Sequence, residues 1–433
     1  MGRMFGTFSL TCFFCLVGSG YGQGETAVSF LLIPTSVEGN GMGGVAASLV
    51  TSDAISTISN PAQLGFFGLN NDLSLSTYTP KTGWLPGNSG SGLSLNATAL
   101  SAGLQLNRYA KLPAAISLGV GYSQVYFDFG TFTTSPANTS TGASQFHAYD
   151  KADNITFGVG IDYVVRLGVG YNFKWINSKL RPSVPAQTAG PIEAKVPAHD
   201  FGMILQIPVV DVASHFRGEP VTFNNRVSPL LNLTLGYASR NVGEEISYAG
   251  QSDPLPRQAA LGWNFEVGLS SQVNDRPWKL LSFTWAREAT DVLVSSSTKE
   301  VASAPGDTSY VSTFSYGSGL GDMRPIDNLL FGKTHGTIDL MKGWQVQLAE
   351  CLYFREGSYT GVGGLLYDTR GASFKLNGFL KLLASLGIWN PAYDWGAYFV
   401  DHFDLQYSRS IYTSTQNSLI NGTEFNSINI VFK

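Results

Sequence analysis

After about residue 70, apolar residues alternate with small or polar residues along much of the chain. In residues 154–163 (NITFGVGIDY) every second side chain is apolar, and residues 167–175 repeat this pattern after a short link. A period of two places the two kinds of side chain on opposite faces of a β-strand, and the short link predicts a tight hairpin. We count about fourteen such segments, among them residues 201–207, 231–237, 261–269, 344–348 and 403–407.

The composition indicates that these strands form a membrane wall. Charged residues make up only 13% of the chain and aromatic residues 12%, whereas soluble domains carry about 25% charged residues. Beyond the first residues, no stretch reaches the run of about 18 apolar residues that a spanning helix needs. We therefore predict an all-β fold: a transmembrane antiparallel β-barrel of about fourteen strands. It would lie in the outer membrane, in contact with lipid and lipopolysaccharide, with apolar side chains outside and small or polar ones facing the lumen.

Residues 1–22 have the layout of a secretory signal peptide. Arg3 is followed by an apolar run over residues 5–17 and by small residues at 18–22. The apolar run is too short to cross about 30 Å of hydrocarbon, which argues against a membrane anchor. After cleavage Cys351 would be the one remaining cysteine, so we expect no internal disulfide.

Residues 23–70 lack the period of two that marks residues 71–433. This segment is rich in Gly, Ser and Ala and closes on Asn60-Pro61-Ala62, and we predict that it forms a plug or collar in the lumen of the barrel. The first strand would then begin near Asp72. Residues 39–44 formally match G-x-G-x-x-G, but no βαβ unit surrounds them, so we favour close backbone packing over nucleotide binding.

The last strand is predicted over residues 424–432, where Ile428, Ile430 and Phe432 share one face. A terminal strand that ends in an aromatic residue resembles the signal read by the barrel assembly machinery, although Lys433 follows Phe432 here. Because lipid cannot satisfy a free sheet edge, we expect this strand to pair with the first one.

Four connections interrupt the alternation. Residues 130–153, 179–199 and 292–324 are polar or rich in proline, and we predict that they are extracellular loops. Residues 381–398 are apolar and aromatic, which favours a connection at a membrane interface; an inward-folded loop is the alternative.

Residues with catalytic or metal-binding patterns are missing from the sequence. None of the five histidines has a second ligand at metal-binding spacing, and no G-x-S-x-G occurs. The net charge of −4 and the lack of a Lys/Arg-rich run argue against a nucleic-acid partner. We expect a protein without enzymatic activity, cofactor or metal site.

Three stretches carry a resemblance to a known family. The first contains Gly41-Met42-Gly43 and Asn60-Pro61-Ala62, the second is residues 235–243 with Leu255-Pro256 after it, and the third is residues 353–357. Together they resemble the PorV/PorQ family of outer-membrane proteins, which is related to the FadL-type transporters of hydrophobic compounds. The family usually has an Arg shortly before its Gly-Met-Gly, where this chain has Ser-Val-Glu-Gly, so the plug must be anchored in another way if that Arg is an anchor.

The resemblance implies two functions. A PorV-like protein would bind secreted cargo proteins in type IX secretion through its lumen and extracellular loops, and the motifs favour this role. A FadL-like protein would take up hydrophobic small molecules, such as fatty acids, by a lateral route through the wall. An interrupted strand, for example the one expected to end at Pro208, would favour such a route. A structural or adhesive barrel is a third possibility.

Overall fold

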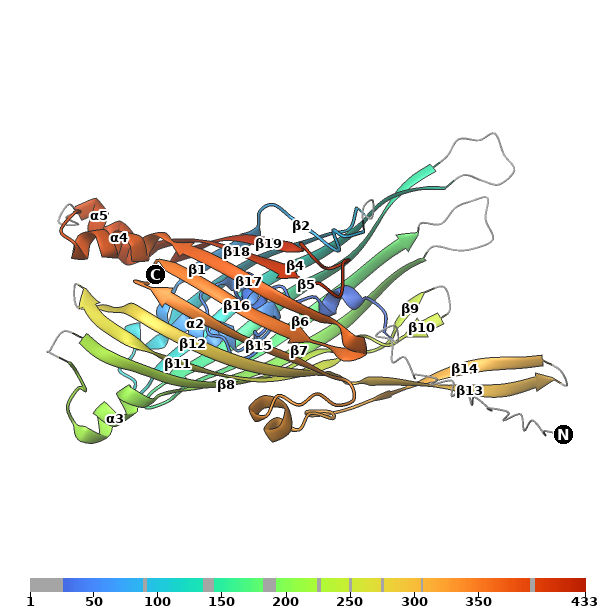
Figure 1. Cartoon of the computed structure of the whole chain (residues 1–433), viewed down its shortest axis with the longest axis horizontal. Helices are drawn as coiled ribbons and strands as arrows, with labels where there is room; N and C mark the ends of the chain where they lie inside the picture. The colour runs from blue at the N-terminus through green and yellow to red at the C-terminus, as the bar shows by residue number, and fades with distance from the viewer. Residues whose placement is uncertain are drawn as a thin grey trace, which may run out of the picture.

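The structure is a computed structural model that describes residues 26–88, 92–134, 144–181, 192–223, 227–248, 251–273, 276–304, 307–389 and 394–433. The predicted signal peptide, residues 1–22, lies outside the described residues. Within these ranges fourteen antiparallel strands close into a ring (Figure 1). They are β1 (Leu73–Tyr78), β3 (Ser94–Gln105), β4 (Ala115–Thr134), β5 (Ser144–Asp162), β6 (Arg166–Arg181), β7 (Ile192–Pro208), β8 (Val227–Gly243), β11 (Gln258–Val273), β12 (Arg276–Val292), β15 (Ile338–Leu348), β16 (Leu352–Thr360), β17 (Leu366–Lys375), β18 (Phe403–Thr413) and β19 (Glu424–Phe432).

The alternation predicted from the sequence forms the two faces of the wall. Phe157 and Val159 on β5 are 49% and 43% exposed, whereas Thr156 between Ile155 and Phe157 is buried. The tight hairpin between β5 and β6 is present, with the Tyr163 amide donating to the Val165 carbonyl. A closed barrel with an apolar outer face is the architecture of outer-membrane proteins, which confirms the predicted fold and location. Other exposed outer-face side chains include Leu118, Val120, Phe173, Trp175, Leu235, Val267, Phe283 and Phe354.

The ring closes through the first and last strands, as predicted. β1 pairs with β19 in a continuous register that runs from Leu73 opposite Phe432 to Tyr78 opposite Ser427. On the lumen side, Asn429 Oδ1 accepts hydrogen bonds from the Ser74 and Ser76 hydroxyls, at 2.8 Å each. Ile428, Ile430 and Phe432 occupy the opposite, outer face of this seam. Recognition of this terminal strand by the barrel assembly machinery stays a prediction.

Three predicted loops are largely hairpins, so these boundary predictions were wrong. β4 continues to Thr134 and β5 begins at Ser144, and β6 and β7 extend in the same way. Most of residues 292–324 is a hairpin of β13 (Val294–Ala304) and β14 (Asp307–Tyr316). These strands project from one end of the barrel (Figure 1), where they need no lipid-facing side, so hydrogen bonding persists without apolar alternation. The connections between barrel strands also contain short elements: β2 (Thr82–Gly83), β9 (Ile246–Tyr248), β10 (Gln251–Asp253), η4 (Ile326–Leu330) and η5 (Val362–Gly364).

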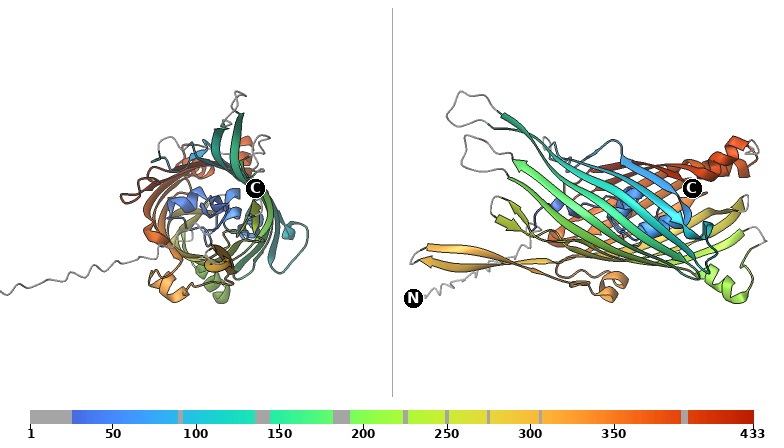
Figure 2. Two further views of the ribbon diagram at one scale, coloured as in Figure 1. Left: turned by 90° about the vertical axis from the view of Figure 1, so that its right-hand side faces the viewer. Right: turned by 180° about the vertical axis from the view of Figure 1, so that it is seen from behind.

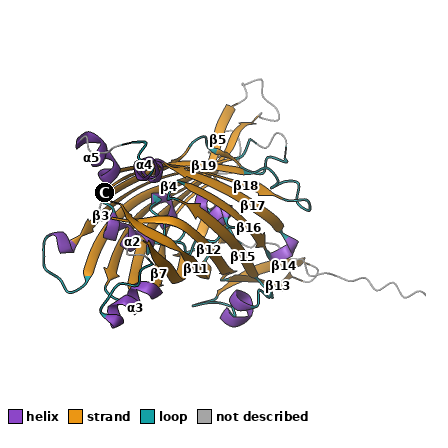
Figure 3. Ribbon diagram, turned by 60° about the vertical axis from the view of Figure 1, so that its left-hand side comes forward, coloured by secondary structure: helices purple, strands orange, loops and turns teal. Residues whose placement is uncertain are grey.

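Residues 381–398 connect β17 to β18, and most of their described part is helical; their placement at a membrane interface stays a prediction. α4 (Leu376–Ser385) and α5 (Asp394–His402) lie beside the C-terminus, at the end opposite the long hairpins (Figure 3). Long loops of outer-membrane barrels face outward, which places these helices and α3 (Val209–Arg217) on the periplasmic side. Among the described residues no helix has the length and hydropathy needed to cross a membrane.

The described part of the predicted plug, residues 26–70, lies inside the ring (Figure 2). It contains η1 (Ser29–Leu32), α1 (Val37–Gly41), η2 (Ala54–Ile58) and α2 (Gln63–Asn70). The helix α1 packs against β16–β19, η2 packs against β1, β3 and β4, and α2 packs against β3–β6. The plug packs closely against glycines of the wall strands. A Cβ on Gly170, for example, would lie 2.2 Å from the Pro61 carbonyl carbon. Other wall glycines that contact the plug are Gly103, Gly119, Gly158, Gly160, Gly168, Gly202, Gly236, Gly343, Gly357 and Gly371.

We predict that Gly43→Ala will destabilise the folded protein much more than Gly364→Ala. Both glycines have a positive φ, +79° and +81°, so both substitutions carry similar backbone strain of about 1 kcal/mol. A Cβ at Gly43 would also lie 2.5 Å from the Ser358 carbonyl oxygen, whereas nothing lies within 4 Å at Gly364. Urea unfolding in lipid vesicles should show an extra loss of roughly 2 kcal/mol or more for the Gly43 variant. Equal losses in the two variants would contradict close packing of the plug.

Candidate functional site

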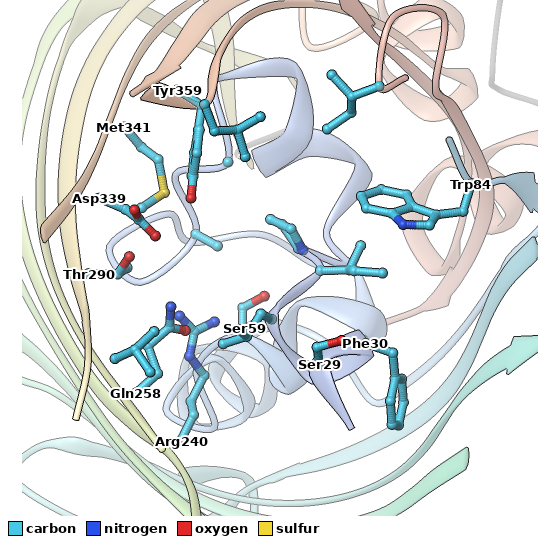
Figure 4. Close-up of a pocket in the computed structure, with 18 of the residues that line it drawn as sticks. Ser29, Phe30, Ser59, Trp84, Arg240, Gln258, Thr290, Asp339, Met341 and Tyr359 are labelled. Atoms are coloured by element: carbon cyan, nitrogen blue, oxygen red, sulfur yellow. The ribbon is translucent and has the colours of Figure 1, made fainter. Parts of the chain in front are cut away.

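A cavity of about 260 Å³ lies in the lumen between the plug and the wall (Figure 4). Much of its lining is apolar or aromatic, from the plug (Phe30) and from the wall (Phe127, Met341 and Tyr359). Trp84, which follows β2, points in from the side opposite Asp339 and Met341 (Figure 4). Its volume leaves room for a small molecule, whereas a neighbouring space between the plug and the wall measures only about 20 Å³.

Four charged side chains also line the cavity: Asp150, Arg240, Glu288 and Asp339. Glu288 ties the wall to the plug, because its Oε2 accepts hydrogen bonds from the amides of Ala46 and Ala47, at 2.7 Å each. Asp339 Oδ1 accepts from the Val362 amide at 2.9 Å. The cavity is therefore amphipathic.

A buried polar cluster on the wall adjoins the cavity. Lys174 Nζ lies 3.0 Å from the Asp200 carboxylate and donates to Asn241 Oδ1 at 2.5 Å. The Asn241 amide donates to Asp200 Oδ1 at 2.6 Å, and its side chain donates to the Pro256 carbonyl at 3.0 Å. Asn241 has a φ of 57° and stands at the register shift between β7 and β8. The stretch 235–243 is thus a strand with a bulge held by this cluster.

The plug is anchored to the wall by a buried ion pair. Glu38 Oε2 lies 3.0 Å from the Arg355 guanidinium, and the Arg355 and Glu38 side chains are 1% and 13% exposed. Gln406 donates to the other Glu38 oxygen at 2.7 Å, and Arg355 also donates to Gln345 at 2.7 Å. Where the family resemblance led us to look for a plug arginine, this chain has a plug carboxylate and places the arginine on the wall.

The residues of the predicted plug motif fall on two sides of the lumen. Gly41 lies against Gly371, and the Gly43 amide donates to Thr369 Oγ1 at 2.8 Å. Met42 packs against the β15 glycine, Gly343.

Asn60, Pro61 and Ala62 contact β6, β7 and β8 instead. Asn60 Nδ2 donates to the carbonyls of Ala47, at 2.7 Å, and Tyr237, at 3.2 Å, and its Oδ1 accepts from the Ala62 amide at 3.0 Å. Neither these three residues nor residues 41–43 line the cavity. The structure therefore gives the motif residues packing contacts rather than a common site.

Sequence reasoning missed Asp150, Arg240, Glu288 and Asp339. Each stands on a strand whose lumen side carries mainly small or polar residues. In a chain with only 13% charged residues, charges on the small or polar face of the predicted strands were the available signal. Among the described residues, no group of three or more His, Cys, Asp or Glu side chains is placed to hold a metal ion.

Pro208 does not interrupt the wall. It is the last residue of β7, pairs with Asn232 on β8 and is followed directly by α3. Every neighbouring pair of strands in the described ring is hydrogen-bonded. The proline thus marks the periplasmic end of a strand.

No protein-family model and no curated protein matches the chain. Among solved structures, the chain is similar to the toluene transporter TodX of Pseudomonas putida, at 12% identity and a TM-score of 0.37, over 92% of this chain and 96% of that one. It is also similar to a FadL homologue of Pseudomonas aeruginosa (13% identity, TM-score 0.29, 92% and 97% covered) and to CdiB of Acinetobacter baumannii (9%, 0.31, 83% and 59%). Similarities of this size do not establish a function, and none of them supports the PorV branch.

We predict that Glu38→Gln will loosen the plug. Removing one partner of a buried ion pair leaves the other charge uncompensated and costs about 3 kcal/mol or more. Glu424→Gln is the control, because Glu424 pairs with Arg409 at a similar 2.8 Å but both side chains are exposed, at 36% and 55%, and such a pair is worth less than about 1 kcal/mol. Urea unfolding and protease cleavage of the plug should both change for the Glu38 variant alone; equal behaviour of the two variants would contradict the anchor.

A second prediction concerns pH and the plug residue Asp53. Burial, reinforced by the charge of Glu38, raises the pKa of this carboxyl from 3.8 to about 6, although hydrogen bonds from Ser76 and the Ile55 amide oppose the shift. Because the folded protein favours the protonated form of Asp53, this carboxyl contributes its full stability below pH 4. The contribution is lost as the pH rises through about 6 and the carboxyl ionises.

Asp53→Asn keeps the N-cap of η2, where Asp53 Oδ1 accepts from the Ile55 amide, but removes the charge. The variant should match the unmodified protein at pH 3 and exceed its unfolding free energy at pH 7.5 by at most about 3 kcal/mol. Urea titrations at the two pH values measure this, and a difference that does not depend on pH would overturn the assignment.

Proposed function

We propose that this protein is a plugged outer-membrane channel that binds a small hydrophobic or amphipathic compound in its lumen, without bond chemistry. The observation that supports this proposal best is the cavity of about 260 Å³ beside the plug. Ligand sites are typically apolar hollows of about 300–1,000 Å³ with a few placed polar groups. The cavity lies slightly below the lower end of that range, which suits a small compound.

The packing of the plug supports a small ligand over a protein in the lumen. The buried Glu38–Arg355 pair and the glycine contacts fill the space between plug and wall. A folded cargo domain would need this whole segment to leave. A compound of about ten non-hydrogen atoms would need only local movement around the cavity.

A PorV-like shuttle of secreted proteins is the second candidate. The observation that favours it is the set of hairpins, β4–β5 and β13–β14 above all, that project beyond the barrel end (Figure 1). They offer backbone edges and polar side chains to a protein partner outside the lumen.

The test fills the cavity with a larger side chain. Val292 lines the cavity at the end of β12, and Val267 lies on the outer face of β11 with 43% exposure. Val292→Trp should weaken binding of 1-octanol to the purified protein in lipid nanodiscs by about tenfold or more, whereas Val267→Trp should not. Calorimetry measures the affinity, and thermal unfolding verifies that both variants are folded.

If neither variant lost octanol binding, the cavity would not be the binding site. If the unmodified protein bound no small hydrophobic compound and instead co-purified with secreted proteins that share a C-terminal β-domain, the shuttle would replace the channel.

A further inference from the structure

The cavity contains a buried carboxylate, Asp150, whose neighbour on β6 is the Ser178 hydroxyl and for which the described residues supply no cation. Asp150 is 4% exposed, and its buried Oδ1 has no hydrogen-bond partner among the described residues. No ion pair of the described residues includes Asp150. A buried charge without a partner is costly, which makes an unpaired lumen carboxylate a site for a group that arrives from outside.

The charged side chains near Asp150 on the neighbouring strands already have partners of opposite charge. Lys174 pairs with Asp200 at 3.0 Å. The charge of Arg240 is balanced by its electrostatic neighbours Glu288 and Asp200. Asp150 and, across the lumen, Asp339 remain without a cation among the described residues. The cavity therefore has a surplus of negative charge.

Aromatic rings surround Asp150. Phe127 on β4 is its direct cross-strand partner, so both side chains face the lumen. Phe127 packs against Phe129, with ring centroids 5.0 Å apart, and against Phe30 of the plug, at 6.4 Å. All four residues line the cavity. A carboxylate next to apolar ring faces is complementary to a molecule with one cationic end and an apolar body.

From this arrangement we propose that the cavity prefers amphipathic amines: small compounds with a protonated amino group at Asp150 and an alkyl or aromatic body against Phe30, Phe127 and Phe129. This inference rests on the proposed function and names its ligand class. An anionic amphiphile is disfavoured, because three carboxylates and a single guanidinium line the cavity. The Arg240 Nε, which is buried and has no hydrogen-bond partner among the described residues, can donate to an additional acceptor on the ligand.

The experiment compares three probes of equal chain length: octylamine, 1-octanol and octanoate. Their affinities for the purified full-length protein in nanodiscs of zwitterionic lipid are measured by calorimetry at pH 7.5. Octylamine should bind about tenfold or more tightly than either of the others. Asp150→Asn should remove this preference by weakening amine binding about tenfold, with octanol binding unchanged.

Asp153→Asn is the matched control. Asp153 lies on the same strand, where it pairs with Lys151 at 2.7 Å and is 25% exposed. This variant should keep the amine preference. Octanol binding without an amine preference, or a preference that survives in Asp150→Asn, would overturn the inference and leave the channel intact. Failure of all three probes to bind would overturn the proposed function itself.

Discussion

The hydrogen bonds between the first and last strands are the constraint on which the molecule depends. In lipid a free strand edge would leave a row of amides and carbonyls without partners, at a cost of several kcal/mol for each group. The short strand β1 meets β19 through six residue pairs, and Asn429 reinforces the seam from the lumen side. Because the ring is closed, the lumen face does not contact lipid and need not be apolar. That face can therefore carry the glycines, hydroxyls and charges on which the plug and the cavity are built.

The plug follows from the small lumen side chains. Where backbone packs on backbone, as at Pro61 against Gly170, a methyl group has no room. The wall and residues 26–70 must consequently fold as one unit around shared contacts. Charge completes the fit: Glu38 reaches Arg355 from the plug, and Glu288 reaches the amides of Ala46 and Ala47 from the wall. Both contacts join the plug to the wall, and Glu288 also lines the cavity.

The period of two predicted the barrel, its fourteen strands and the seam, because lipid imposes that period on every spanning strand. It failed where lipid ends: residues 292–304 continue as strands above the membrane with no apolar side to mark them. It did not show that residues 381–385, within the predicted apolar connection, belong to the helix α4. The cavity could not be read from the pattern at all, since it joins Phe30, Asp150 and Asp339 from distant parts of the chain.

Where this chain keeps its few charges is informative about function. Several lumen carboxylates have a cation within 3.1 Å, as in Lys174–Asp200, Glu266–Lys279 and Lys375–Asp404. Such pairs satisfy each other and contribute little net stability. Asp150 differs, because no cation of the described residues pairs with it and its buried Oδ1 accepts no hydrogen bond from them. A buried carboxylate without a cation is costly, and this cost is the reason for proposing a ligand at Asp150. The proposed ligand is amphipathic because three phenylalanine rings line the same cavity as this carboxylate.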